Sequence, residues 1–130
     1  MTVHPHITVF QRAMSAFSAG DMKALAKVFA PGVVWHLTGR GPLSGVYEGR
    51  DATFGLFARV FELSGGTFAS RLRDVLANDD HTVALLHGTA SREGRHLDMD
   101  FAIVFHIDEG KVTEGWETWT DQAAFGEFWS

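Results

Sequence analysis

The sequence predicts one α+β domain over residues 1–130, with helices in the first half and an antiparallel sheet in the second half. Apolar side chains recur at helical spacing in three runs before residue 64, whereas four later segments alternate apolar and polar side chains. Helices followed by a long run of strands are typical of the α+β class. With 130 residues, of which 45% are apolar, the chain can bury one sizeable core.

The ends of the first two helices can be assigned from single residues. Pro5 suits the first turn of a helix, and Gly20 ends the apolar stripe that follows it. Asp21 can cap a second helix, which Pro31-Gly32 then stops.

A short β run and a loop lead from the second helix to the third. The β run covers residues 33–39, and the loop at residues 39–45 is rich in Gly and Pro. Asp51 can cap the third helix, which the Ser and two Gly at residues 64–66 close.

The second half of the chain predicts an antiparallel meander. Its four β segments lie near residues 67–77, 81–91, 96–107 and 111–119, and short polar turns of the hairpin type separate them. One face of the third segment is wholly apolar, so we expect it to face the helices. A curved sheet around helices leaves an apolar interior in which a small ligand could sit.

The composition argues against several classes of function. The chain has no cysteine, which removes disulfides, thiolate nucleophiles and Cys-based zinc sites. Its net charge of -5 and its scattered basic residues argue against a nucleic-acid partner. The start has no signal-peptide pattern, and no apolar stretch approaches the roughly 20 residues that cross a bilayer. We therefore expect a cytoplasmic protein without a membrane partner.

Three stretches carry a resemblance to a known family, and the resemblance covers nearly the whole chain. These are GDMKALAKVFAPGVVWHLTG, LSGVYEGRDATFGLFARVF and DEGKVTEGWE. They resemble the nuclear-transport-factor-2-like superfamily, in its SnoaL-like and ketosteroid-isomerase-like branch. The resemblance implies a cone-shaped barrel, in which a curved antiparallel sheet wraps around the N-terminal helices. It also implies a pocket between helices and sheet, and a homodimer through the convex face.

The catalytic residues of the ketosteroid isomerases have no counterpart in this chain. The resemblance places Leu37 at the position of the catalytic base, and Ala13 and Ile103 at the positions of the oxyanion-hole residues. All three residues are apolar, so we do not expect steroid isomerisation by that mechanism. SnoaL-like cyclases instead use an Asp near the end of the last strand, which corresponds here to Asp121. Compared with the cyclase pattern, this chain has one more residue between its Gly-Lys-Val turn, at residues 110–112, and Asp121.

The last strand supplies both candidate catalytic residues, Glu117 and Asp121. Alternation places Glu117, Trp119 and Asp121 on one face, which the resemblance assigns to the pocket. A carboxylate against indole has its charged form disfavoured, which raises its pKa toward the range useful for proton transfer. Alternatively, Asp121 caps a helix at residues 122–129, and the backbone N–H groups then lower its pKa.

The remaining ligand-binding candidates line the predicted interior. Tyr47, the only tyrosine, could donate a hydrogen bond to a ligand carbonyl or could merely close its loop. The full set of ligand-binding candidates is Trp35, Leu37, Tyr47, Phe57, Leu86, Met99, Phe101, Ile103 and Trp119.

The outer face of the predicted sheet combines histidines and aspartates with apolar residues. His87 and His106 lie there near Asp98 and Asp100. These residues could form a metal site, but we expect them to form hydrogen-bonded pairs instead. We expect His36 to be structural, and we expect no metal and no cofactor. The same face is too apolar to stay exposed, which predicts a homodimer, through Val83, Leu85, Ala102, Val104 and Trp116.

Three classes of function remain open at this stage. The first is a cofactor-free isomerase or cyclase that transfers a proton on an apolar carbonyl or polyketide-like substrate. The second is a non-catalytic binder of an apolar small molecule. The third is a dimeric structural domain with a filled cavity.

Overall fold

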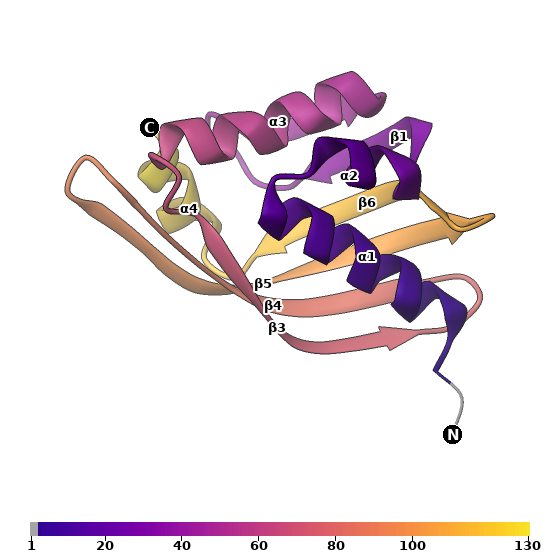
Figure 1. Ribbon diagram of the computed structural model, residues 1–130. Helices are drawn as coiled ribbons and strands as arrows, with labels where there is room; N and C mark the ends of the chain where they lie inside the picture. Colours follow the sequence, from indigo (N-terminus) through magenta and orange to yellow (C-terminus); the bar gives the residue numbers. More distant parts are fainter. Residues whose placement is uncertain (1–2) are drawn as a thin grey trace.

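A curved six-stranded sheet with helices against its concave face forms the protein (Figure 1). The computed structural model describes residues 3–130. Its helices are α1 (Pro5–Ala19), α2 (Met22–Val28), α3 (Arg50–Leu63) and α4 (Gln122–Trp129). Its strands are β1 (Phe29–Leu37), β2 (Gly45–Glu48), β3 (Ala69–Ala77), β4 (Thr82–Arg92), β5 (Arg95–Asp108) and β6 (Lys111–Trp119).

The sheet order is β2-β1-β6-β5-β4-β3, with β2 and β3 at the two edges. Strands β3 to β6 pair in sequence as the predicted antiparallel meander. The predicted α+β class and the curved sheet around helices are therefore confirmed. The sheet is not closed, however, so the cone is an open one.

The prediction of a purely antiparallel sheet is wrong at β1, which lies parallel to β6 and antiparallel to β2. Strand β1 also starts at Phe29, earlier than predicted, because Pro31-Gly32 does not end the strand. Both of these residues are exposed, and the pairing with β6 shifts between Phe29 and Val34. Such an irregularity lets a strand contain Pro and Gly that a regular ladder would reject.

The start of α3 also differs from the prediction. Gly49, with a φ of 90°, occupies the N-cap and makes no side-chain cap hydrogen bond, while Asp51 lies in the first turn. The Arg50 guanidinium donates a 2.7 Å hydrogen bond to the Phe29 carbonyl, which joins the start of α3 to the start of β1. Strand β2 precedes this cap and was not predicted from the sequence.

The core lies between the helices and the concave face of the sheet. On β5, the predicted inward set includes the buried residues Leu97, Phe101 and Phe105. Helices α1, α2 and α3 cross this face, and α4 packs at one end of the sheet (Figure 1). Among residues 3–130, no helix is long and apolar enough to span a membrane.

Candidate small-molecule site

A cavity of about 90 Å³ lies between the helices and the concave face of the sheet. A single water needs roughly 10–15 Å³ on this measure, so the cavity can hold several waters or one ring-sized organic molecule. Most of its wall is aliphatic or aromatic. Eight residues predicted from the sequence line it, namely Trp35, Leu37, Phe57, Leu86, Phe101, Ile103, Glu117 and Trp119.

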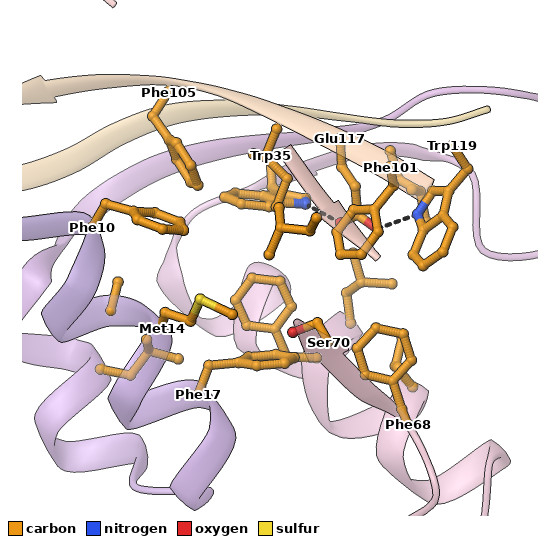
Figure 2. Close-up of a pocket in the computed structure, with 18 of the residues that line it drawn as sticks. Phe10, Met14, Phe17, Trp35, Phe68, Ser70, Phe101, Phe105, Glu117 and Trp119 are labelled. Atoms are coloured by element: carbon orange, nitrogen blue, oxygen red, sulfur yellow. Dashed lines mark hydrogen bonds between the residues drawn. The ribbon is translucent and has the colours of Figure 1, made fainter. Parts of the chain in front are cut away.

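Glu117 is the one ionisable side chain among the described residues that line the cavity. It projects from β6, and each carboxyl oxygen accepts a hydrogen bond from a different indole (Figure 2). Trp35 Nε1 donates to Oε1 at 3.1 Å, and Trp119 Nε1 donates to Oε2 at 2.6 Å. The two bonds fix the carboxyl group from two strands, β1 and β6.

Burial raises the pKa of Glu117, while the hydrogen bonds from Trp119 and Trp35 lower it by a smaller amount. The apolar wall disfavours the charged form, and the two indole N–H groups compensate for only part of the lost hydration. The carboxyl group therefore stays protonated to a higher pH than an ordinary Glu. It is also a stronger base once it has lost its proton.

Both indoles that bind Glu117 lie against a glycine of the sheet. An added Cβ at Gly115 would come within 3.0 Å of the Trp35 ring, and one at Gly88 would do so with the Trp119 ring. Glycine weakens a strand interior, and it often marks a place where another group approaches the backbone closely. Here it lets each ring reach Glu117.

The Trp119 ring is held on both of its faces. It stacks on Phe101 with 4.0 Å between ring centroids, and on Phe125 of α4 with 4.4 Å. Its side chain is almost fully buried. The donor to Oε2 of Glu117 is therefore fixed in place by packing as well as by its own hydrogen bond.

Two polar groups of the cavity wall were not predicted from the sequence. Ser70 lines the cavity from β3, and its hydroxyl projects into it (Figure 2). Trp129 of α4 also lines the cavity, and its buried Nε1 has no hydrogen-bond partner within residues 3–130. Nothing in the local sequence distinguishes Ser70 from other serines, and the side-chain alternation of β3 is broken between Leu72 and Asp74.

The structure places three of the predicted site residues outside the cavity wall. Asp121 is exposed at the N-cap of α4, where its carboxylate accepts a 3.0 Å hydrogen bond from the Ala124 N–H. The Tyr47 hydroxyl donates to the Leu43 carbonyl at 2.5 Å, and burial raises the pKa of Tyr47. Met99 is partly buried on β5 and packs against the core. Asp121 and Tyr47 thus occupy the capping and loop-closing positions that were the alternatives to a pocket role.

The three residues that the resemblance places at the catalytic positions of the ketosteroid isomerases all lie in the cavity wall. Ala13, Leu37 and Ile103 contribute only apolar surface there. The ionisable group of the cavity wall within residues 3–130, Glu117, enters from a different strand position.

On the convex face of the sheet, the histidines pair with neighbouring groups. His87 Nδ1 lies 2.7 Å from an Asp100 oxygen, and its Nε2 contacts Asp98. His36 lies 2.7 Å from a Glu114 oxygen and stacks on Trp116. Within residues 3–130, no group of three or more His, Cys, Asp or Glu residues has the arrangement of a metal site.

Comparisons with known proteins agree with this architecture. Residues 10–115 match the SnoaL-like domain family. An uncharacterized protein of Mycobacterium tuberculosis (strain ATCC 25618 / H37Rv) is 33% identical over 131 residues, covering 100% of both chains. Solved structures described as cystatin-like or NTF2-like share the fold.

Two solved structures illustrate the range of similarity. The structure of Bal32a, from a soil-derived mobile gene cassette, has a TM-score of 0.93 and 36% identity, covering 97% of each chain. A putative SnoaL-like polyketide cyclase from Jannaschia sp. CCS1 has a TM-score of 0.81 and 15% identity, covering 97% of this chain and 92% of the other. The predicted resemblance to SnoaL-like and nuclear-transport-factor-2-like proteins is confirmed.

Proposed function

Since the chain belongs to the SnoaL-like family, we propose that it is a cofactor-free isomerase or cyclase that transfers a proton on an apolar carbonyl compound. One observation carries the proposal: the Glu117 carboxyl group lies inside an otherwise apolar cavity, between two indole N–H donors. A buried acid without a function would be a costly residue to keep.

The proposed reaction starts with Glu117 as a carboxylate beside a C–H group adjacent to the substrate carbonyl. Glu117 takes the proton, the C–H electron pair forms a C=C bond, and the carbonyl π pair moves onto oxygen. Returning the proton to a different carbon isomerises the substrate. Attack of the enolate carbon on a second carbonyl of the same molecule instead closes a ring.

The surroundings of Glu117 suit this role. Burial raises the pKa of the carboxyl group, so its two protonation states interconvert closer to neutral pH than those of an exposed Glu. The indole N–H groups of Trp35 and Trp119 orient it, and the apolar wall excludes competing water. General acid–base catalysis of this kind contributes roughly 10²–10⁴-fold to a rate.

The fold of the polyketide-cyclase neighbour supports the substrate class by analogy alone, since the identity is only 15%. Polyketides carry carbonyl groups with acidic C–H neighbours, which is the chemistry that Glu117 could perform.

A second candidate function is binding of an apolar small molecule without chemistry. The observation that favours it is that both Glu117 oxygens already accept hydrogen bonds from the protein. In that case the carboxyl group would recognise a polar atom of the ligand and would transfer no proton.

Deuterium exchange into a small ketone tests the proposal without knowledge of the natural substrate. The probe is cyclopentanone, a neutral single-ring ketone with C–H groups on both sides of its carbonyl, and proton NMR in D₂O follows the exchange. We expect the wild-type protein to speed exchange above buffer, and Glu117→Gln to lose roughly a hundredfold or more of that acceleration.

Asp121→Asn is the matched control, because Asn supplies the same capping oxygen to the Ala124 N–H. We expect it to exchange deuterium like the wild type. If Asp121→Asn instead abolishes exchange while Glu117→Gln retains it, the acid–base residue is Asp121. Binding of cyclopentanone with no exchange by the wild type would favour the non-catalytic binder.

A further inference from the structure

Ser70 supplies a second polar group to the cavity. Apart from Glu117 and the indoles, no other polar side chain lines the cavity within residues 3–130. Its hydroxyl projects into the cavity from β3, while Glu117 enters from β6 (Figure 2). No protein group within residues 3–130 hydrogen-bonds the Ser70 side chain. The hydroxyl is therefore available to a bound molecule.

The Trp119 indole connects the surroundings of Ser70 with Glu117. Ser70 pairs with Gly88 across the β3–β4 ladder, and the far edge of the Trp119 ring lies against Gly88. The Nε1 of the same ring donates to Glu117. The Trp119 ring thus lies between Glu117 and Gly88, the cross-strand partner of Ser70.

The polarity of the wall restricts what the hydroxyl can bind. Within residues 3–130, no Lys, Arg or His lines the cavity, so an anionic ligand would lose its hydration without a compensating charge. A neutral acceptor oxygen can take the Ser70 proton as a donor at little cost. Ketone and ester carbonyls are the common groups of this kind.

We propose that the Ser70 hydroxyl donates a hydrogen bond to the carbonyl oxygen of a neutral, ring-sized substrate whose adjacent C–H group faces Glu117. This inference rests on the proposed function. When Glu117 takes the proton, the C–H bond breaks, a C=C bond forms and negative charge develops on the carbonyl oxygen. The Ser70 hydrogen bond strengthens at that moment, and Ser70 keeps its own proton throughout.

A matched pair of probes isolates the carbonyl oxygen. They are cyclopentanone and methylidenecyclopentane, in which a CH₂ group replaces the oxygen at nearly constant shape. We expect the wild type to bind the ketone roughly three- to tenfold more tightly, in line with one hydrogen bond. Calorimetry gives the affinities, and the indole N–H signals in NMR spectra report occupancy of the cavity.

Three variants assign the preference to one donor. Ser70→Ala should bind both probes equally, whereas Ser15→Ala, at an exposed position of α1, should keep the wild-type preference. Glu117→Gln should also keep the preference. In the exchange assay, Ser70→Ala should slow turnover of bound cyclopentanone by roughly tenfold or more, because the enolate oxygen loses its donor.

Several outcomes overturn the inference. A Ser70→Ala protein that still prefers the ketone shows that Ser70 does not bind the carbonyl. Loss of the preference in Trp129→Phe but not in Ser70→Ala assigns the carbonyl to the unpaired Trp129 N–H instead. If cyclopentanone does not bind the wild type at all, this inference and the proposed function both fail.

One further outcome separates the two proposals. If the wild type exchanges no deuterium but shows a preference for the ketone that Ser70→Ala removes, the proposed catalysis fails. The assignment of Ser70 as the carbonyl-binding residue then stands.

Discussion

On the concave face of the sheet, the Glu117 carboxyl group lies among aromatic rings and is held by two indoles. On the convex face, the half-exposed Asp100 carboxylate contacts His87 and Arg73 instead. Burial raises the pKa of Glu117, whereas the hydrogen bonds from His87 and Arg73 lower the pKa of Asp100. One sheet thus carries two carboxyl groups whose pKa values are shifted in opposite directions.

This difference comes from what surrounds each carboxyl group. A carboxylate with cationic partners and access to water stays charged, and it contributes to surface charge pairing. A carboxyl group with only indole N–H donors in an apolar wall keeps a reactive proton. The concave face therefore holds a desolvated carboxyl group, whereas the convex face holds solvated charge pairs.

The largest effect is expected on the concave face, where Gly88 and Gly115 make room for the two indoles. The added methyl group of Gly88→Ala would clash with the Trp119 ring, and that of Gly115→Ala with the Trp35 ring. Overpacking of this kind lowers the free energy of unfolding by about 1–3 kcal/mol. Chemical denaturation measures the loss. The Trp35 and Trp119 indole N–H signals in NMR spectra should also shift, because each ring must move away from Glu117.

Gly55→Ala is the control for this prediction, because nothing lies within 4 Å of an added Cβ at that exposed position of α3. It should stabilise the helix by about 0.5–1 kcal/mol. Unchanged stability and unchanged indole signals in Gly88→Ala would show that the glycine does not position Trp119.

The surroundings of Glu117 were only partly predictable from the sequence. Alternation from the last turn places Glu117 and Trp119 on the inner face, and the structure confirms that both line the cavity. The hydrogen bond from Trp35 joins residues 82 positions apart, and it depends on β1 lying parallel to β6. Local patterns do not specify that pairing, because it depends on the tertiary packing that brings β1 beside β6, the last strand of the meander.

The fold was more predictable than the site for a physical reason. Helix ends and strand alternation are local, so three of the four helix starts and the whole meander follow from the sequence. Ser70 and Trp129 acquire their positions only through tertiary packing. Asp121 has the local signature of a helix cap, and that signature is what the structure realises.

The next effect concerns the convex face, through which we propose that the protein forms a homodimer. Leu85 is 41% exposed there, and Val104 and Trp116 are only partly buried. Light scattering at micromolar concentration should give the mass of a dimer. Leu85→Glu should weaken association by more than about tenfold, since it places a charge in an apolar contact.

Glu117→Gln serves as the concave-face control in the same measurement and should remain dimeric. A wild-type protein that is monomeric at micromolar concentration would contradict the homodimer. Dissociation of Glu117→Gln to a monomer would instead indicate that the two faces are coupled through the sheet.

A smaller effect is expected from the pH dependence of Glu117. Because its folded-state pKa is raised, the unfolded chain releases this proton first as pH rises. The wild type therefore loses stability from about pH 4 upward, until the pH passes the raised pKa of the folded state. Gln does not titrate, so the stability of Glu117→Gln relative to the wild type should increase through the same window.

Glu117→Gln also loses stability by an amount that does not depend on pH, because Gln has one acceptor oxygen for the two indole donors. The indole that loses its partner costs about 1–3 kcal/mol at every pH. The test is therefore the slope of the stability difference with pH in denaturation experiments. A difference that stays flat between pH 4 and pH 8 would show that the Glu117 carboxyl group is not buried as described.

The smallest effect belongs to His87 on the convex face, where water screens the charges. The hydrogen bonds that His87 donates to Asp100 and, next in size, to Asp98 raise the pKa of His87, while the bond from His87 lowers the pKa of Asp100. The His87 contribution is complete below the ordinary pKa of histidine and is lost as pH rises through the raised value. The Asp100 contribution is complete above the ordinary pKa of aspartate and is lost as pH falls through the lowered value. Both are present together between about pH 4 and pH 6.5.

His87→Gln should therefore lower the melting temperature slightly in that window, and the loss should shrink toward pH 9 and with added salt. A loss that is equally large at pH 9 would mean that His87 stabilises the sheet by packing on its neighbours, without a charge.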